Sequence, residues 1–336
     1  MDLDIALESK VGPAAFRELG LLAEQYGFRT IWAQNYARAP DAFMTAVPLA
    51  LASKTIGVGV AVVCPHEMHP LKIANAVLTL NEHAGGRARV VVTSGGEWPG
   101  VLKTKSGEIT RTREALEIIN AAMGDKVVNY SGEIYNVQAF STSWTSQSPP
   151  TIYAGAHRPK MMRMMTGQTN AIMLSDIQPP MFNWALAELK ETLAQSSPED
   201  SFHLSNFVSW HVKEDREASL WEARRELIIR GWLDHDWIAP YLSPEDAEWV
   251  AANPWPFLKA FRERTGDIKD VPSHISDALV EGLTLSGDPG DIDRHIERRR
   301  EFKAAGFTEI VLGLQDDPAE SIKLIGERIL PQLRNG

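Results

Sequence analysis

The sequence holds a single cysteine, Cys64, among 336 residues, so no disulfide can form within the chain. One thiol is consistent with a reducing compartment, and we expect a cytoplasmic protein. No apolar run approaches the roughly 20 residues that span a bilayer. The first ten residues, MDLDIALESK, contain no basic segment followed by an apolar one. These absences predict a chain with neither a membrane span nor a signal peptide.

Positive charge is also scarce. Lys and Arg number 34 against 44 Asp and Glu, which gives a net charge of −10 at pH 7. Such a surface repels phosphate backbones and anionic lipids, so we expect neither a nucleic-acid nor a membrane partner. An anionic ligand would need a local cluster of basic side chains.

Several common functional motifs are missing as well. The chain has no G-x-S-x-G, no Walker A loop and no G-x-G-x-x-G. His66 and His69 lack the H-E-x-x-H context, and Asp234-His235-Asp236 stands alone, so we expect no metal site. Cys64 ends an apolar run, where a structural thiol is more common than a nucleophile.

What the sequence does contain is a regular alternation of apolar, β-branched runs with segments of helical period. Eight predicted strands, each followed by a predicted helix, cover residues 3–7, 29–33, 56–63, 88–93, 151–154, 170–174, 202–212 and 309–314. The predicted helices cover 13–26, 41–53, 71–83, 112–123, from 159 onward, 181–194, 216–230 and 318–330. Eight such units are the count of a (β/α)₈ TIM barrel, within the α/β class; an open doubly wound sheet is the alternative.

Two segments interrupt the alternation. Residues 126–139 read as a β-hairpin around Ser131-Gly132. Residues 231–285 hold four of the ten tryptophans and five prolines, and we expect a helical insertion there, before the eighth strand. The insertion either helps to build the active site or packs outside the barrel as an oligomer contact. We treat residues 1–336 as one domain and expect a homo-oligomer, a dimer.

In a barrel, the active site lies where the strands end. The turn Ser94-Gly95-Gly96-Glu97 follows the fourth predicted strand. Its two glycines would let a flat ligand approach the backbone closely. Glu97 would then project near that ligand as an acid or base, unless it is an ordinary exposed loop glutamate.

A second small-residue turn follows the fifth predicted strand. It reads Gly155-Ala156-His157-Arg158, and Pro159-Lys160 opens the next helix. Free backbone N–H groups at a helix start can hold a phosphate, and Arg158, Lys160 and Arg163 would add positive charge. The alternative is an ordinary strand-to-helix turn.

Short motifs spread in order along nearly the whole chain resemble those of the luciferase-like flavin- and F420-dependent oxidoreductases. They are Phe28–Tyr36, Ile56–Pro70, Leu80–Glu97, Ile152–Met161, Ser286–Pro289 and Ala305–Leu314. Within that superfamily the chain is most similar to F420-dependent methylenetetrahydromethanopterin reductases. The resemblance implies hydride transfer between a ring cofactor and a small organic substrate at the barrel mouth.

The resemblance also implies where the cofactor lies. The segment Ala61-Val62-Val63-Cys64 would back the ring, with a bulge at a position where the family often has a non-prolyl cis peptide. The turn from Gly155 to Lys160 would hold the phosphate, and Ser94, Gly95 and Gly96 would flank the ring. Coenzyme F420 is the first choice of cofactor and FMN the alternative. With FMN, the reaction could be an O₂-dependent monooxygenation; a barrel that binds its ligand without turnover is the remaining alternative.

The chain departs from the family pattern at one important place. Asn35 and Tyr36 stand where many relatives have Asp and His. Because histidine is a common proton-transfer group, the usual acid–base scheme does not carry over. We therefore predict that Glu97, Tyr36 and Asn35 are the catalytic residues, with Glu97 or Tyr36 handling the proton.

Overall fold

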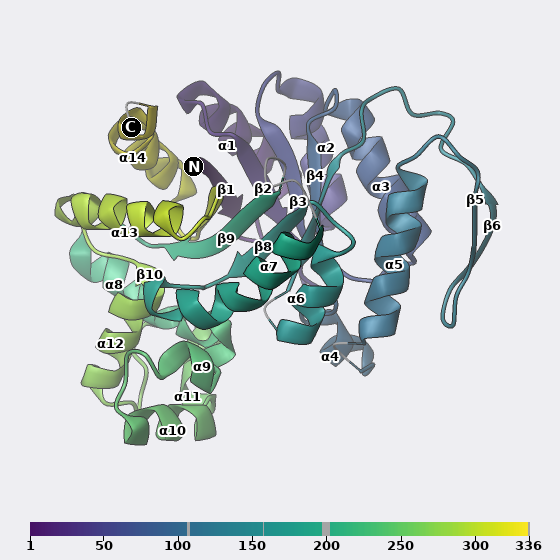
Figure 1. The fold of residues 1–336 in the computed structure, drawn as a ribbon. Helices are drawn as coiled ribbons and strands as arrows, with labels where there is room; N and C mark the ends of the chain where they lie inside the picture. The colour runs from purple at the N-terminus through teal and green to yellow at the C-terminus, as the bar shows by residue number, and fades with distance from the viewer. Residues whose placement is uncertain (106–107, 157, 197–201, 335–336) are drawn as a thin grey trace.

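The computed structural model of the chain describes residues 1–105, 108–156, 158–196 and 202–334. Its centre is a closed barrel of parallel strands (Figure 1). They are β1 (Asp2–Leu7), β2 (Thr30–Gln34), β3 (Gly57–Val63), β4 (Ala88–Thr93), β7 (Thr151–Gly155), β8 (Ala171–Ser175), β9 (His203–Trp210) and β11 (Glu309–Leu314). Each strand pairs with the next in this order, and β11 pairs back with β1. The predicted (β/α)₈ barrel is thus confirmed, and the open sheet is excluded.

Helices surround this barrel. They are α1 (Pro13–Tyr26), α2 (Ala42–Ala52), α3 (Pro70–His83), α5 (Ile109–Ala122), α6 (Pro159–Thr166), α7 (Phe182–Ser196), α8 (Arg216–Arg225), α13 (Ile292–Ala304), α14 (Pro318–Arg328) and α15 (Leu330–Arg334). Local signals fix their ends: α1 begins with Pro13 and stops at Gly27, whose φ of 82° suits glycine. The N-terminus of α2 is capped by Asp41, which accepts from the Met44 N–H at 2.8 Å.

The predicted hairpin is present as β5 (Val128–Ser131) and β6 (Asn136–Phe140), which pair antiparallel. It extends along the outside of α5, at the right of Figure 1. The buried carboxylate of Glu114 on α5 accepts the backbone N–H groups of Glu133, Ile134 and Tyr135. This single side chain therefore anchors the hairpin turn to the barrel layer.

The insertion consists of short helices: α9 (His235–Ile238), α10 (Pro244–Ala252), α11 (Trp255–Glu263) and α12 (Ser273–Leu283). They gather at the lower left of Figure 1. Short 3₁₀ turns also occur: η1 (Pro179–Met181) precedes α7, and η5 (Pro289–Asp291) precedes α13. η3 (Leu227–Ile229) comes just before the insertion, and η4 (Gly231–Leu233) opens it.

Most boundaries shift by one to three residues from the sequence prediction, and three differences go further. The helix expected over 216–230 ends at Arg225. Leu227 and Ile228 in η3 are buried as well, so the apolar pattern in the sequence extends beyond the end of the helix. Residues 284–285, which were assigned to the insertion, form β10 (Thr284–Leu285). This strand pairs with the last residues of β9, beyond the point where β9 stops pairing with β8. A short helix, α4 (Trp98–Leu102), lies where no element was predicted.

Charged side chains fill the barrel at the amino-terminal end of the strands. Arg29 pairs with the buried carboxylates of Asp4 and Glu309. The Tyr153 hydroxyl donates to both oxygens of Glu309 at 2.9 Å, and Trp32 Nε1 donates to Asp4 at 3.0 Å. Above them, apolar side chains on the inner faces of the strands form a layer that includes Ala6, Trp32, Val91, Met173 and Val311. These two layers close the barrel at the amino-terminal ends of the strands and form the floor of a cavity at their carboxyl-terminal ends.

Candidate functional site

A cavity of about 330 Å³ opens at the carboxyl-terminal ends of the strands. This volume is at the lower end of the range of small-molecule sites. Its walls come from β2, β3, β4, β7, β8 and β9, the loops that follow these strands, and the residues that open the insertion. Predicted residues in the walls are Asn35, Tyr36, Ala61, Val62, Gly96, Glu97, Gly155 and Ala156. The fold therefore brings all three predicted catalytic residues to one space.

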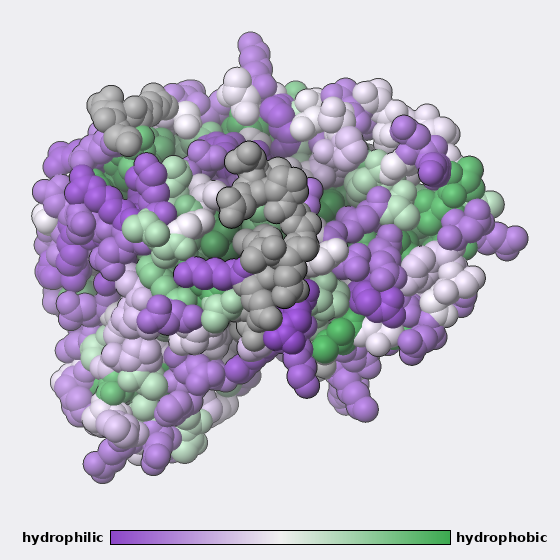
Figure 2. Space-filling view, viewed as in Figure 1, coloured by the Kyte–Doolittle hydropathy of each residue, from purple (hydrophilic) through white to green (hydrophobic). Residues whose placement is uncertain are grey.

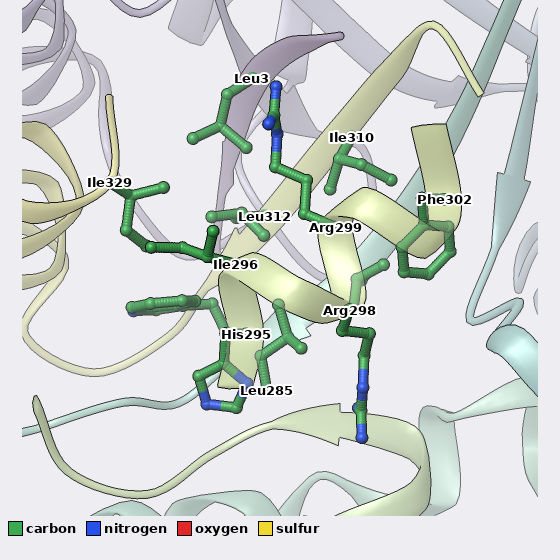
Figure 3. A pocket seen from close by; sticks show the side chains of 12 residues that line it. Leu3, Leu285, His295, Ile296, Arg298, Arg299, Phe302, Ile310, Leu312 and Ile329 are labelled. Carbon is green, nitrogen blue, oxygen red and sulfur yellow. The ribbon is translucent and has the colours of Figure 1, made fainter. Parts of the chain in front are cut away.

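A second, far smaller crevice lies on the outside of the barrel, between α13 and the strands (Figure 3). It measures about 30 Å³ and is lined mainly by apolar side chains such as Leu3, Ile296 and Phe302. A gap of this size holds no more than about two water molecules. We regard it as a packing defect and not as a ligand site.

The wall at the end of β3 has the expected bulge. The Ala61–Val62 peptide bond is cis, and the pairing with β4 shifts register between Ala61 and Val63. Ala61 and Val62 face the cavity, whereas Val63 and Cys64 are buried behind them. Burial raises the pKa of the Cys64 thiol to about 11, which keeps it protonated at neutral pH. Cys64 thus has the features of a structural thiol.

Asn35 holds this bulge through a residue that sequence reasoning missed, Glu67. The Asn35 side-chain nitrogen donates to the Val62 carbonyl at 3.0 Å and to both Glu67 oxygens at 2.9 and 3.0 Å. Glu67 in turn accepts the Cys64 N–H at 2.7 Å. Burial raises the pKa of Glu67. Asn35 therefore acts on the shape of the wall, and its amide suits a carboxylate partner that an aspartate would repel.

Gly96 and Glu97 line the cavity beside this bulge, after the neighbouring strand β4. Gly96 has a φ of 72°, and a Cβ there would lie 3.7 Å from Val62 Cγ2. Glu97 accepts the Ala37 N–H, which ties the loop after β4 to the loop after β2. Gly95 is buried, and neither Gly95 nor Ser94 is among the described residues that line the cavity.

Tyr36 lies among charged groups. Burial raises the pKa of its hydroxyl, and the carboxylates of Glu97 and Asp176 act in the same direction, while Arg230 opposes them. The hydroxyl is therefore protonated at neutral pH and can donate a hydrogen bond or a proton.

A buried ion pair stands beside Tyr36. Arg230 Nη1 donates to Asp176 Oδ1 at 2.7 Å, and both side chains are 3% exposed. The Arg230 guanidinium lies 5.8 Å from the ring centre of Phe207, and all three residues line the cavity. The sequence analysis did not single out Arg230, because it was placed at the end of a long helix. Trp232, two residues further, also lines the cavity and is 60% exposed, so the insertion does contribute to the site.

The turn after β7 contributes Gly155 and Ala156 to the cavity, and α6 starts beside it with Pro159. The Arg158 side chain is engaged by two carboxylates in this structure and is not free for a phosphate. Its guanidinium lies 2.5 Å from Asp234 and 3.8 Å from Asp236, both in the insertion. Lys160 is exposed. His157 lies outside the described residues.

His211, which follows β9, is not among the described residues that line the cavity. Its Nδ1 lies 2.7 Å from Glu222 and its Nε2 lies 2.7 Å from the Ser209 hydroxyl. Although burial opposes ionisation, His211 and Lys213 hold the pKa of Glu222 below its usual range. All three members of this chain of hydrogen bonds are buried, so no substrate can reach them; they fix α8 to the barrel.

Within the described part of the chain, no group of three or more His, Cys, Asp or Glu side chains is arranged to hold a metal ion. The same residues include no helix that is long and apolar enough to cross a membrane.

Comparison with known proteins places this chain in a family. Residues 2–309 match the family model described as luciferase-like monooxygenase. The chain is 31% identical over 320 residues to a 5,10-methylenetetrahydromethanopterin reductase of Archaeoglobus fulgidus, covering 93% of this chain and 94% of the relative. The chain belongs to the luciferase-like family, as the sequence motifs predicted, and it is an oxidoreductase of that class.

Solved structures agree on the fold. The coenzyme F420-dependent tetrahydromethanopterin reductase from Methanopyrus kandleri superposes with a TM-score of 0.77 at 19% identity, covering 98% of this chain and 99% of that one. An F420-dependent secondary alcohol dehydrogenase, solved with an F420–acetone adduct, gives 0.76 at 17% identity and covers 99% of both chains.

Proposed function

We propose that this chain transfers a hydride between coenzyme F420 and a small organic substrate in the cavity at the barrel mouth. The observation that carries the proposal is the 330 Å³ cavity at the carboxyl-terminal ends of the strands. Ala61 and Val62 of the bulge and the neighbouring Gly96 line this cavity, in a chain 31% identical to a methylenetetrahydromethanopterin reductase. When bound, F420 supplies or accepts the hydride. The protein supplies position and electrostatics.

The residues present suit a flat ring cofactor. A Cβ on Gly96 would touch Val62 Cγ2 at 3.7 Å, and a Cβ on Gly155 would come within 3.0 Å of Val91 Cγ1. Both glycines therefore keep the walls thin where a ring would lie. Asn35 and Glu67 would fix the bulge that backs the ring.

The phosphate of the cofactor would be held at the start of α6. The free backbone N–H groups of the first turn of α6 and the positive end of this helix favour an anion there. Lys160 is exposed and suits this role. Arg158 would join it only by exchanging its contact with Asp234 for the phosphate.

Glu97 and Tyr36 are the proposed proton-handling groups. Both line the cavity, and the Tyr36 hydroxyl remains protonated at neutral pH because burial raises its pKa. Glu97 is held in place by the Ala37 N–H. A tyrosine donor beside a carboxylate is a workable acid–base pair when the substrate oxygen or nitrogen gains a proton after hydride transfer.

An FMN-dependent monooxygenase is the second candidate function. The family model that covers residues 2–309 is described as a monooxygenase, which favours it. A barrel that binds its ligand without turnover is the third.

Titration of the purified protein with F420 and with FMN, followed by ligand fluorescence, separates these functions. We expect tight F420 binding, weak FMN binding and a several-fold loss of F420 affinity in Lys160→Ala. Lys54→Ala, on the loop after α2, serves as the matched control and should bind F420 normally. A preference for FMN would move the assignment to the monooxygenase, and binding of neither cofactor would refute the site. Glu97→Gln tests the proton role, since an unchanged rate would remove Glu97 from the mechanism.

We further propose that the chain forms a homo-oligomer, a dimer, in the cytoplasm, without nucleic-acid partners. The face seen in Figure 2 is mainly hydrophilic. In contrast, α2 is apolar along most of its length and leaves Met44 68% and Leu51 64% exposed. A helix that is apolar on all sides is normally covered. Light scattering on the wild type and on Met44→Glu/Leu51→Glu would test the assembly, with a shift to monomer expected.

A further inference from the structure

The charged side chains around the cavity are few and unevenly balanced. Among the described residues that line it, the acidic and basic side chains are Glu97, Asp176 and Arg230. The arginine is the only positive group of the three. Whether its charge is neutralised by another side chain therefore decides whether the cavity can accept an anion.

Asp176 pairs with that arginine through one guanidinium nitrogen, while the buried Arg230 Nε has no hydrogen-bond partner among the described residues. The Asp176 carboxylate lies 2.7 Å from Arg230 Nη1, with both side chains 3% exposed, so water does not screen the charges of the pair. Asp176 Oδ2 also accepts from the Ser175 hydroxyl at 2.9 Å and from the Gly231 N–H at 3.3 Å, which fixes its orientation. The nearby buried carboxylate of Glu226 is occupied by Arg225 Nε at 2.8 Å and does not compete for Arg230.

With Arg230 neutralised, the carboxylate of Glu97 is left without a cationic partner in the cavity. Its described contact is the Ala37 N–H, a neutral donor. The cavity therefore carries a net negative charge in surroundings of low polarity, where a second anion would be repelled strongly. Positive charge near the mouth sits instead at Lys160, at the start of α6, since Asp234 neutralises Arg158.

We infer that Asp176 is a specificity residue: by neutralising Arg230, it makes the cavity accept neutral or cationic organic groups and exclude substrates that bring a phosphate, sulfonate or carboxylate to the reacting end. The inference rests on the proposed function, because it takes this cavity to be the substrate site. It adds the charge class of the substrate and the residue that sets it.

Two probes of equal shape test this selectivity: methanesulfonate, which is an anion, and dimethyl sulfone, its neutral counterpart. Calorimetric titration is made in the Lys160→Ala background, so that the basic group at α6 does not contribute. The starting protein should bind dimethyl sulfone and bind methanesulfonate far more weakly. Asp176→Asn should strengthen methanesulfonate binding by about tenfold or more and leave dimethyl sulfone unchanged. Adding Arg230→Met to Asp176→Asn should abolish the gain.

A second variant covers the case in which Asp176→Asn does not fold. Glu97→Gln removes the other negative charge and leaves the ion pair intact, and it should also strengthen methanesulfonate binding several-fold. The inference is wrong if the starting protein binds methanesulfonate as well as dimethyl sulfone, or if neither Asp176→Asn nor Glu97→Gln improves anion binding. F420 titration of the Lys160-containing wild type separates the two proposals. Failure to bind F420 with the charge selectivity intact refutes the function alone, and F420 binding without the selectivity refutes this inference alone.

Discussion

Replacing Glu309 with Gln removes one charge from the floor of the barrel and preserves the shape of the side chain. In the folded chain, the carboxylate accepts from the Tyr153 hydroxyl, lies 2.9 Å from His203 Nδ1 and pairs with Arg29. Although burial opposes ionisation, these partners hold the pKa of Glu309 at about 2, compared with the ordinary value of 4.5. The side chain is fully buried, so solvent screening does not reduce the effect.

The sign of the effect follows from the lowered pKa. The ionised carboxylate stabilises the folded chain above about pH 4.5, and this stabilisation is lost as the pH falls toward 2. It amounts to about 3 kcal/mol at pH 7 and about 1 kcal/mol at pH 3. Asp4 acts in the opposite direction, because burial raises its pKa. The total stability therefore varies less with pH than the contribution of Glu309 alone.

The difference between wild type and Glu309→Gln isolates that contribution. Urea unfolding followed by tryptophan fluorescence should give a difference in the free energy of unfolding of about 3 kcal/mol at pH 7 that more than halves by pH 3. Glu320→Gln is the control: this exposed residue pairs with Lys323 at 2.7 Å and should change stability by no more than about 0.5 kcal/mol. A Glu309→Gln difference that is equal at pH 7 and pH 3 would refute the account of the barrel floor.

Three further changes test the cavity. Tyr36→Phe should lower kcat and alter the basic limb of the pH–rate profile while the Kd for F420 stays within about twofold, measured by steady-state kinetics and fluorescence titration. Asn35→Asp places a second carboxylate at about 3 Å from Glu67 and should lower the free energy of unfolding at pH 7 by about 1–3 kcal/mol, less at pH 5, with recovery in Asn35→Asp/Glu67→Gln. Gly96→Ala, at a φ of 72°, should cost about 1 kcal/mol of stability and weaken F420 binding several-fold, whereas Gly100→Ala, with open space around it, should not.

Elements with local signals could be predicted closely from the sequence. The strand over 88–93 and the helix over 13–26 have the predicted bounds, because apolar pattern, proline and glycine mark them within a few residues. The barrel followed from counting such units. Its treatment as one domain stays a prediction.

Residues whose roles depend on distant partners could not be found this way. Glu67 meets Asn35 across 32 positions, and Arg230 meets Asp176 across 54. Periodicity assigned Arg230 to a helix, since nothing near it in the sequence indicates an ion partner on β8. Arg158 was expected to offer free positive charge, but Asp234, 76 positions later, neutralises it. Charge at the mouth is thus a property of the assembled fold.

The opening residues of the insertion connect these observations. Arg230 neutralises Asp176 at the end of β8, and Asp234 pairs with Arg158 at the end of β7. Without this segment, the barrel would present a bare carboxylate at one strand end and an unpaired guanidinium at the next. A change in residues 230–234 would therefore alter the charges at the ends of β7 and β8 without altering either strand. Because Trp232 stands between the two ion pairs and faces the cavity, the same five residues also set the shape of the entrance. Substrate choice could change through this segment alone, while the floor around Glu309 keeps the barrel stable.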